Sequence, residues 1–443
     1  MGYNVGMISL GCDKNRVDAE VMLSSLKERG YNIVNEPQDA DIIIVNTCGF
    51  IESAKEESID TILEMAQNKK SGRCKGVIAT GCMAQRYSKQ LMEEMPELDA
   101  VVGTGSYREI ADVADEIIRG SHSIIRTGEL NYNLDYEKRI ISTPSYYAYI
   151  KIAEGCSNNC TYCIIPKLRG HFRSRTMESI VKEAEELAGS GVKELIVVAQ
   201  DTTMYGRDIY GRKALPELLR KLEAIEGIHW IRILYSYPEE ITDELIDTIA
   251  ESKKICHYLD IPLQHVSDNV LKAMNRRNTY EQTVELIDKL RGRIPDVIIR
   301  TTFIVGFPGE SQEDFQQLYS FLQDYKLDRV GIFAYSQEED TPAAVMENQI
   351  EENVKEERKN LLMKLQRKIV KEKNKSYIGK VMEVIIDEGD DEGIYYGRTY
   401  GDSPDIDQQV IIRRSGIALK KGDIINVRIK DTYTYDLLGD VEK

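Results

Sequence analysis

The segment EGCSNNCTYC carries three cysteines within eight residues, at Cys156, Cys160 and Cys163. A structural zinc site needs four closed ligands, so this loop would require a fourth, for which His171 is the candidate. Thiolates are also the usual ligands of iron–sulfur clusters. Three cysteines on a cubane leave one iron open to a substrate or cofactor. The spacing therefore favours a cluster, with zinc as the alternative.

Cysteine usage and charge restrict the kind of protein further. The eight cysteines gather in clusters, in a chain without a recognisable signal peptide or an apolar run long enough to cross a membrane. Such clusters indicate metal or redox chemistry rather than disulfides, so we expect a soluble cytoplasmic protein. The net charge of −16 argues against a non-specific nucleic-acid binder and permits a basic protein partner.

Residues 1–120 alternate strand and helix patterns. This alternation predicts a doubly wound parallel α/β domain, and no GxGxxG motif follows its first strand to indicate a dinucleotide site. Helices are expected at Val17–Arg29 and Ser53–Gln67. The strands are expected at Val5–Ser9, Asp41–Asn46, Gly76–Thr80 and Ala100–Val102.

A second set of cysteines follows three of these strands. Cys12, Cys48 and Cys82 each stand just beyond the carboxyl end of a strand and before a helix. Because the carboxyl ends of parallel strands meet at one edge of a sheet, we expect these cysteines to converge there. The alternative is that they are small buried hydrophobic residues.

A second run of strand–helix units follows a predicted linker at residues 121–145. About six such units with right-handed crossovers predict a partial (β/α) barrel within residues 146–376, with functional residues at the carboxyl ends of its strands. The charged stretch 351–375 is expected to be a solvated helix, with a basic nucleic-acid arm as the less favoured alternative. The strands are expected at Tyr147–Ala153, Glu194–Ala199, Trp230–Tyr235, Tyr258–Ile261, Val297–Val305 and Arg329–Ala334.

Residues 377–443 change to short alternating strands separated by Gly and Asp turns, which predicts a small all-β barrel of OB-like type. This segment has fourteen acidic and nine basic residues, a net charge of −5. An RNA-binding barrel should carry the opposite sign, so direct nucleic-acid binding is not favoured. We expect that removing this segment weakens substrate binding and leaves the metal sites intact.

The CxxxCxxC loop after the first barrel strand, with Tyr162 before its last cysteine, resembles the radical S-adenosylmethionine superfamily. The resemblance implies that Cys156, Cys160 and Cys163 hold a 4Fe–4S cluster whose open iron chelates the methionine moiety of S-adenosylmethionine. It further implies reductive cleavage of this cofactor to a 5′-deoxyadenosyl radical, which abstracts hydrogen from an unactivated C–H bond.

The cysteine set ahead of this barrel and the small β domain behind it resemble the methylthiotransferases over essentially the whole chain. The resemblance implies a second 4Fe–4S cluster on Cys12, Cys48 and Cys82, whose open iron carries the sulfur to be inserted. It also implies that S-adenosylmethionine is both radical source and methyl donor, and that the carboxyl-terminal domain is a TRAM domain.

The motif GCDKNRVDAE is similar to GCPKNxVDxE, the pattern of the branch that modifies the β-carbon of an aspartate in ribosomal protein S-twelve. Asp13 replaces the usual proline, whereas tRNA enzymes typically show GCQMN. The segments NTCGFIESAKEESID and QEEDTPAA also resemble the ribosomal branch, although Asp340 replaces a glycine. The implied partners are S-twelve, within the small ribosomal subunit, and an unidentified electron donor. A tRNA adenosine methylthiotransferase and a non-catalytic metal-bearing RNA-binding module remain the alternatives.

The resemblance also places S-adenosylmethionine across the barrel mouth, and no single side chain is predicted to be catalytic. Asp201 and Gln264 could instead contact the substrate. Arg169, Arg173 and Arg175 are expected to fasten the cysteine loop or to pair with the cofactor carboxylate. The predicted cofactor-binding residues are Tyr162, Gln200, Gln264, Arg300 and Gly306.

Overall fold

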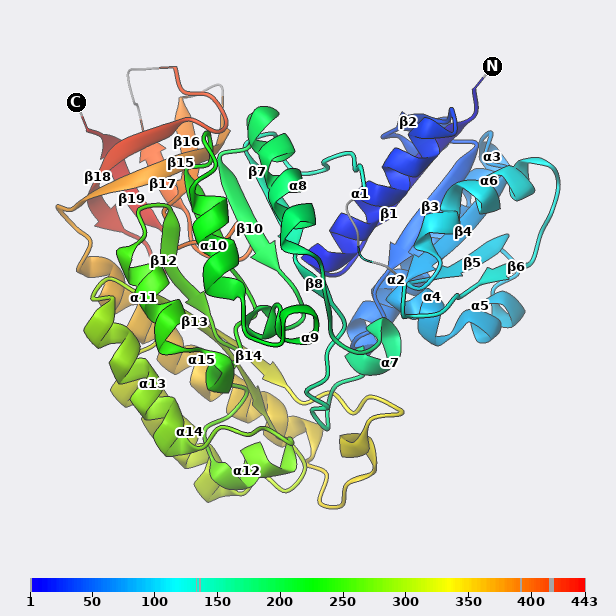
Figure 1. The fold of residues 1–443 in the computed structure, drawn as a ribbon. Coiled ribbons are helices and arrows are strands. Elements are labelled where there is room, and N and C mark those ends of the chain that lie inside the picture. Colours follow the sequence, from blue (N-terminus) through cyan, green and yellow to red (C-terminus); the bar gives the residue numbers. More distant parts are fainter. Residues whose placement is uncertain (1, 133, 135–136, 391–392, 414–417, 443) are drawn as a thin grey trace.

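The computed structural model describes residues 2–132, 134, 137–390, 393–413 and 418–442. A parallel sheet near the amino terminus lies beside a second parallel sheet, and a small carboxyl-terminal barrel also packs against the second sheet (Figure 1). In these described ranges, none of the helices has the length and apolar character needed to cross a membrane.

The first sheet is parallel and has six strands in the order β2-β1-β3-β4-β5-β6. Apolar side chains pack on both of its faces, so the predicted doubly wound architecture is confirmed. The strands are β1 (Asn4–Ser9), β2 (Asn32–Val34), β3 (Ile42–Thr47), β4 (Gly76–Gly81), β5 (Ala100–Gly103) and β6 (Ile124–Arg126). The helices are α1 (Asp13–Glu28), α2 (Glu52–Ala66), α3 (Asn68–Ser71), α4 (Cys82–Arg86), α5 (Ser88–Glu94) and α6 (Ile110–Ile118).

Two short strands of this sheet were not predicted. β2 and β6 have three residues each and lie at the two edges of the sheet. β6 pairs with β5, so the sheet continues past residue 120 into the segment predicted to be a linker. Three residues are too few to produce a period that distinguishes a strand from a loop.

The second sheet has six parallel strands in the order β14-β13-β12-β11-β10-β7. The sheet curves into a partial barrel, which is open because its two edge strands, β7 and β14, do not pair. The long helices lie on the outside of this barrel (Figure 1). The strands are β7 (Tyr147–Lys151), β10 (Glu194–Val198), β11 (Trp230–Ile233), β12 (Ile255–Asp260), β13 (Ile298–Val305) and β14 (Arg329–Ala334), and β8 (Ala153–Glu154) with β9 (Arg173–Ser174) forms a separate antiparallel pair. The helices are α7 (Ile165–Arg169), α8 (Met177–Gly189), α9 (Arg207–Tyr210), α10 (Leu215–Glu223), α11 (Asp243–Glu251), α12 (Asp268–Ala273), α13 (Tyr280–Arg293), α14 (Gln312–Tyr325) and α15 (Glu352–Lys375).

Helix α15 is not the solvated helix that its composition suggested. Leu362, Ile369 and Val370 are buried against the partial barrel, and Arg358 forms an ion pair of 3.0 Å with Glu310. Lys355 and Arg358 are buried as well, and most of the other charged side chains of this helix are exposed. When only about one residue per turn is buried, most residues of the helix are still charged, so the composition alone does not reveal the buried face.

The carboxyl-terminal domain is a closed five-stranded barrel in the order β15-β16-β17-β19-β18, which confirms the predicted small all-β domain. The last strand was not predicted from the sequence. The strands are β15 (Val381–Gly389), β16 (Ile394–Arg398), β17 (Val410–Arg413), β18 (Ile424–Thr432) and β19 (Leu437–Val441).

Buried ion pairs attach this domain to the second sheet. Glu194 of β10 accepts hydrogen bonds from Arg232 of β11, at 2.8 Å, and from Arg398 of β16. Arg329 pairs with Asp402 at 2.7 Å. Removing residues 377–443 would therefore uncover the charges of Glu194 and Arg232, so that deletion is not a clean test of substrate binding.

Replacing Arg398 by alanine is expected to lower the free energy of unfolding by about 3 kcal/mol, because Glu194 would lose one of its two buried partners. Urea denaturation measures this loss. The matched control is Arg428→Ala in the same domain, whose ion pair with Glu442 is open to solvent and should cause a much smaller loss. Equal losses in the two variants would contradict the assigned role of Arg398.

Candidate active site

The first cysteine set lies at one edge of the first sheet. Cys12 is the N-cap residue of α1, Cys48 directly follows β3, and Cys82 is the first residue of α4 after β4. Their three strands, β1, β3 and β4, are direct neighbours in the sheet. The convergence predicted from the sequence therefore follows from the strand order.

Glycines allow the loops of this set to approach each other. Gly11 has a φ of +83°, and a Cβ at this position would lie 2.9 Å from the Cβ of Cys48. A Cβ on Gly49 would lie 2.8 Å from the Cα of Met83, next to Cys82. Neither glycine can be replaced without moving the cysteine loops apart.

The second cysteine set lies on the loop between β8 and α7. The amide of Cys156 donates to the carbonyl of Gly170 at 3.1 Å, and that of Cys163 donates to Cys160 at 3.0 Å. The sulfur of Cys160 lies 2.8 Å from the hydroxyl of Tyr237. These contacts hold the three thiols on a short loop at the carboxyl end of the second sheet.

Both sets of thiols suit iron–sulfur chemistry. Burial raises the pKa of Cys156 to about 11, and burial likewise raises the pKa of Cys82 to about 11. Buried thiols of this kind ionise when a metal supplies the countercharge. Among the described residues, no three or more His, Cys, Asp or Glu side chains are placed to hold a single metal ion. The binding of a cluster by each of these cysteine sets stays a prediction.

Arg169 joins the two cysteine sets. It ends α7, directly after the second set, and its Nε donates to the sulfur of Cys82 at 3.3 Å. Its guanidinium also contacts Asn15, at 2.7 Å, and Asp18 in α1. One arginine therefore fastens the second cysteine loop to the first, which is one of the two roles expected for it.

A buried carboxylate, Glu154, lies beside this arginine. It pairs with Lys151 at 2.6 Å and with Arg169 at 3.4 Å. Burial alone would raise the pKa of Glu154, but the two cations outweigh burial and lower it. Gln200 donates to Glu154 at 2.5 Å, and the buried side-chain oxygen of Gln200 has no partner among the described residues. The contact of Gln200 with S-adenosylmethionine stays a prediction.

The other predicted cofactor-binding residues lie in different surroundings. The ring of Tyr162 packs edge-on against Phe307, with centroids 6.4 Å apart. Gln264 has a φ of +69° and follows β12. Its backbone amide donates to Thr302 and its carbonyl accepts from Ile304, both in β13. A Cβ on Gly306 would lie 2.3 Å from Lys355, so packing requires a glycine there. Their contact with S-adenosylmethionine stays a prediction.

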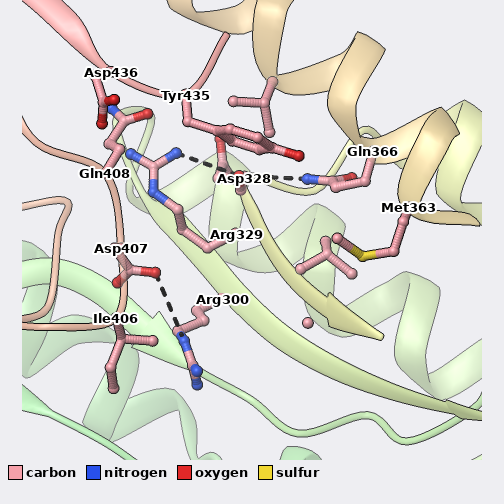
Figure 2. A pocket seen from close by; sticks show the side chains of 13 residues that line it. Arg300, Asp328, Arg329, Met363, Gln366, Ile406, Asp407, Gln408, Tyr435 and Asp436 are labelled. Atoms are coloured by element: carbon pink, nitrogen blue, oxygen red, sulfur yellow. Dashed lines mark hydrogen bonds and ion pairs between the residues drawn. The ribbon is translucent and has the colours of Figure 1, made fainter. Parts of the chain in front are cut away.

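Arg300, another predicted cofactor-binding residue, is paired with carboxylates of the protein itself. It donates to Asp260 at 2.8 Å and lies 3.8 Å from Asp407 of the carboxyl-terminal domain. Figure 2 shows this second contact beside a cavity of about 280 Å³ between β14, α15 and the carboxyl-terminal domain. Its guanidinium is already neutralised by two carboxylates, and its contact with the cofactor stays a prediction.

Two residues near the second cysteine set were missed by the sequence analysis. Tyr237 contacts Cys160, and Arg276 lies over the Tyr237 ring at 3.9 Å from the centroid. The Nε and Nη1 of Arg276 are buried without a partner in the described part of the chain. Neither residue belongs to a recognisable motif, so only the three-dimensional contacts identify them. Asp201, considered as a substrate contact, accepts from Asn158 of the cysteine loop at 2.8 Å.

Three family models match successive parts of the chain. The radical SAM superfamily matches residues 150–322, the uncharacterized protein family UPF0004 matches residues 4–103, and the TRAM domain matches residues 378–441. The order of these models agrees with the three sheets described above.

Full-length relatives narrow the family. The chain is 53% identical over 438 residues to the ribosomal protein uS12 methylthiotransferase RimO of Clostridioides difficile, covering 99% of this chain and 98% of the relative. It is 54% identical over 443 residues to the RimO protein of Clostridium botulinum, covering 99% and 98%. The chain belongs to the RimO family. Membership confirms the resemblance to radical SAM methylthiotransferases, and within them to the ribosomal branch, that the cysteine motifs indicated.

Solved structures agree with this RimO fold at much lower identity. The radical S-adenosylmethionine methyltransferase TsrM from Kitasatospora setae is 14% identical, with a TM-score of 0.59 over 78% of this chain and 77% of that chain. The cobalamin-dependent S-adenosylmethionine radical enzyme OxsB is 12% identical, with a TM-score of 0.53 over 82% of this chain and 56% of that chain. At these identities the likeness concerns the fold alone.

Proposed function

We propose that this protein inserts a methylthio group at the β-carbon of an aspartate in ribosomal protein uS12, the protein called S-twelve above. The observation that carries the proposal is the pair of cysteine sets joined by Arg169, in a chain matched over its full length by RimO proteins. Two sets of three cysteines give two clusters, each with one iron not bound by a cysteine.

The two clusters have different tasks in this proposal. The cluster on Cys156, Cys160 and Cys163, when bound, supplies the electron that cleaves S-adenosylmethionine. The cluster on Cys12, Cys48 and Cys82, when bound, would carry the sulfur that is inserted. The protein itself holds the two loops together and excludes water between them, because the residues that connect them, Arg169 and Glu154, are 2% and 0% exposed.

The charge of the carboxyl-terminal barrel supports a basic substrate less strongly than its composition suggests. Four of its acidic residues contact the domain of the second sheet, where Asp387 contacts Tyr146, Asp402 contacts Arg329, Asp407 contacts Tyr258 and Glu383 contacts His229. Exposed carboxylates such as Glu388, Asp431 and Asp440 remain on its surface. These remaining charges can steer a basic protein by long-range attraction.

A competition experiment tests the proposal. The anaerobically reconstituted protein, S-adenosylmethionine and a chemical reductant are mixed with both uS12 and tRNA. The expected product is uS12 with a methylthio group on one aspartate, seen as a mass increase on a single peptide. Binding of uS12 should weaken as salt rises, because exposed charges are screened. Methylthiolation of tRNA alone would overturn the proposed substrate, and absence of any cleavage of S-adenosylmethionine would overturn the proposed enzyme class.

A further inference from the structure

Lys14 is a buried lysine beside the first cysteine set. It is the second residue of α1, two positions after Cys12, and is 6% exposed. Its Nζ lies 3.4 Å from the centroid of the Tyr235 ring. Within the residues that the structure describes, no ion pair joins Lys14 to a carboxylate, and the neighbouring Asp13 instead lies 3.5 Å from the Tyr235 hydroxyl. A buried ammonium is costly unless it is paired, so Lys14 is suited to bind an anion.

The tyrosine beneath this lysine is held in an unusual conformation. Tyr235 has a φ of +62°, which is rare for a bulky residue and often marks a functional site. Its amide donates to Asp260 at 3.0 Å, and Asp260 is held in turn by Arg300. The ring therefore has a fixed place under the ammonium.

The same short segment also reaches the second cysteine set. Tyr237, two residues after Tyr235, lies 2.8 Å from the sulfur of Cys160. One side of this segment thus contacts Lys14 beside Cys12, and the other side contacts Cys160. Lys14 lies at the junction of the two sets, where a substrate carbon must meet both the radical and the sulfur.

A cation at this junction suits the aspartate of uS12, a step that rests on the proposed function. The β-carbon of an aspartate is bonded directly to its carboxylate carbon, so an ion pair to the carboxylate also fixes the position of the reacting carbon. Holding the reacting atom in place in this way is a large part of what an active site contributes.

We propose that Lys14 binds the carboxylate of the target aspartate, while the Tyr235 ring holds the ammonium from below. The other cations nearby are less suited. Arg300 is already paired with Asp260 and Arg169 with Asp18, and Arg276 lies over Tyr237 on the side of Cys160.

The test compares the reconstituted full-length protein with its Lys14→Met and Lys14→Arg variants. The substrates are uS12 and uS12 in which the target aspartate is changed to asparagine. We expect Lys14→Met to keep its iron and its substrate-independent cleavage of S-adenosylmethionine, and to lose about 100-fold or more in kcat/KM for uS12 methylthiolation. In binding measurements, wild type should prefer the aspartate form by about tenfold or more, Lys14→Met should bind both forms equally, and Lys14→Arg should recover part of the preference.

The control is Lys75→Met. Lys75 is exposed, lies over the Tyr3 ring at 4.4 Å and directly precedes β4. It is therefore at the opposite end of this strand from Cys82, and its replacement should change nothing in these assays. The proposal is overturned if Lys14→Met prefers aspartate as wild type does, or if it loses iron or cofactor cleavage together with methylthiolation. Failure of the wild-type protein to modify uS12 would instead overturn the proposed function, so the two failures are distinguishable.

Discussion

Replacing Cys156, Cys160 and Cys163 together by alanine is expected to abolish reductive cleavage of S-adenosylmethionine and to halve the iron content, from about eight to about four irons per chain. The reason is that these thiols are the protein ligands proposed for the cofactor-binding cluster, and their loop has no other cysteine. Iron and sulfide analysis after anaerobic reconstitution, together with the yield of 5′-deoxyadenosine, measures both effects.

The matched control for this variant is Cys74→Ala. Cys74 is buried and lies before the amino end of β4, at the opposite end of this strand from Cys82. It should retain about eight irons and full cofactor cleavage. About one zinc per chain in the wild-type protein, with no visible absorption, would refute both proposed clusters.

Replacing Cys12, Cys48 and Cys82 together by alanine is expected to stop methylthiolation while cleavage of S-adenosylmethionine continues. The second cysteine loop keeps its own hydrogen bonds, from Cys156 to Gly170 and between Cys160 and Tyr237, without these cysteines. The variant should therefore still bind about four irons and form 5′-deoxyadenosine.

The same variant also removes the contact between Cys82 and Arg169, which fastens the second cysteine loop to the first. Loss of the Cys82 sulfur removes one of the hydrogen-bond acceptors of Arg169, but Asn15 and Asp18 still hold the guanidinium. The second loop should therefore stay in place. The two assigned roles would be reversed if cleavage of S-adenosylmethionine were lost without the Cys12, Cys48 and Cys82 set and kept without the Cys156, Cys160 and Cys163 set.

Much of the architecture could be predicted from the sequence because it depends on local patterns. Alternating apolar segments indicated both parallel sheets, and the position of Cys12, Cys48 and Cys82 after three strands indicated one shared edge. The short strands β2 and β6 and the buried face of α15 were missed. Three-residue strands carry no period, and the face that α15 buries depends on which sheet it packs against.

The sequence by itself determined which residues are the candidate cluster ligands, because the spacing of Cys156, Cys160 and Cys163 within one loop is a local property of the chain. Only the tertiary structure decided which side chains surround them. Arg169 contacts Cys82, 87 residues away in the sequence, and Lys14 contacts Tyr235 of another domain. Arg300 pairs with Asp260 of the neighbouring strand. Such pairings depend on how the domains pack together, and no local pattern of residues encodes that packing.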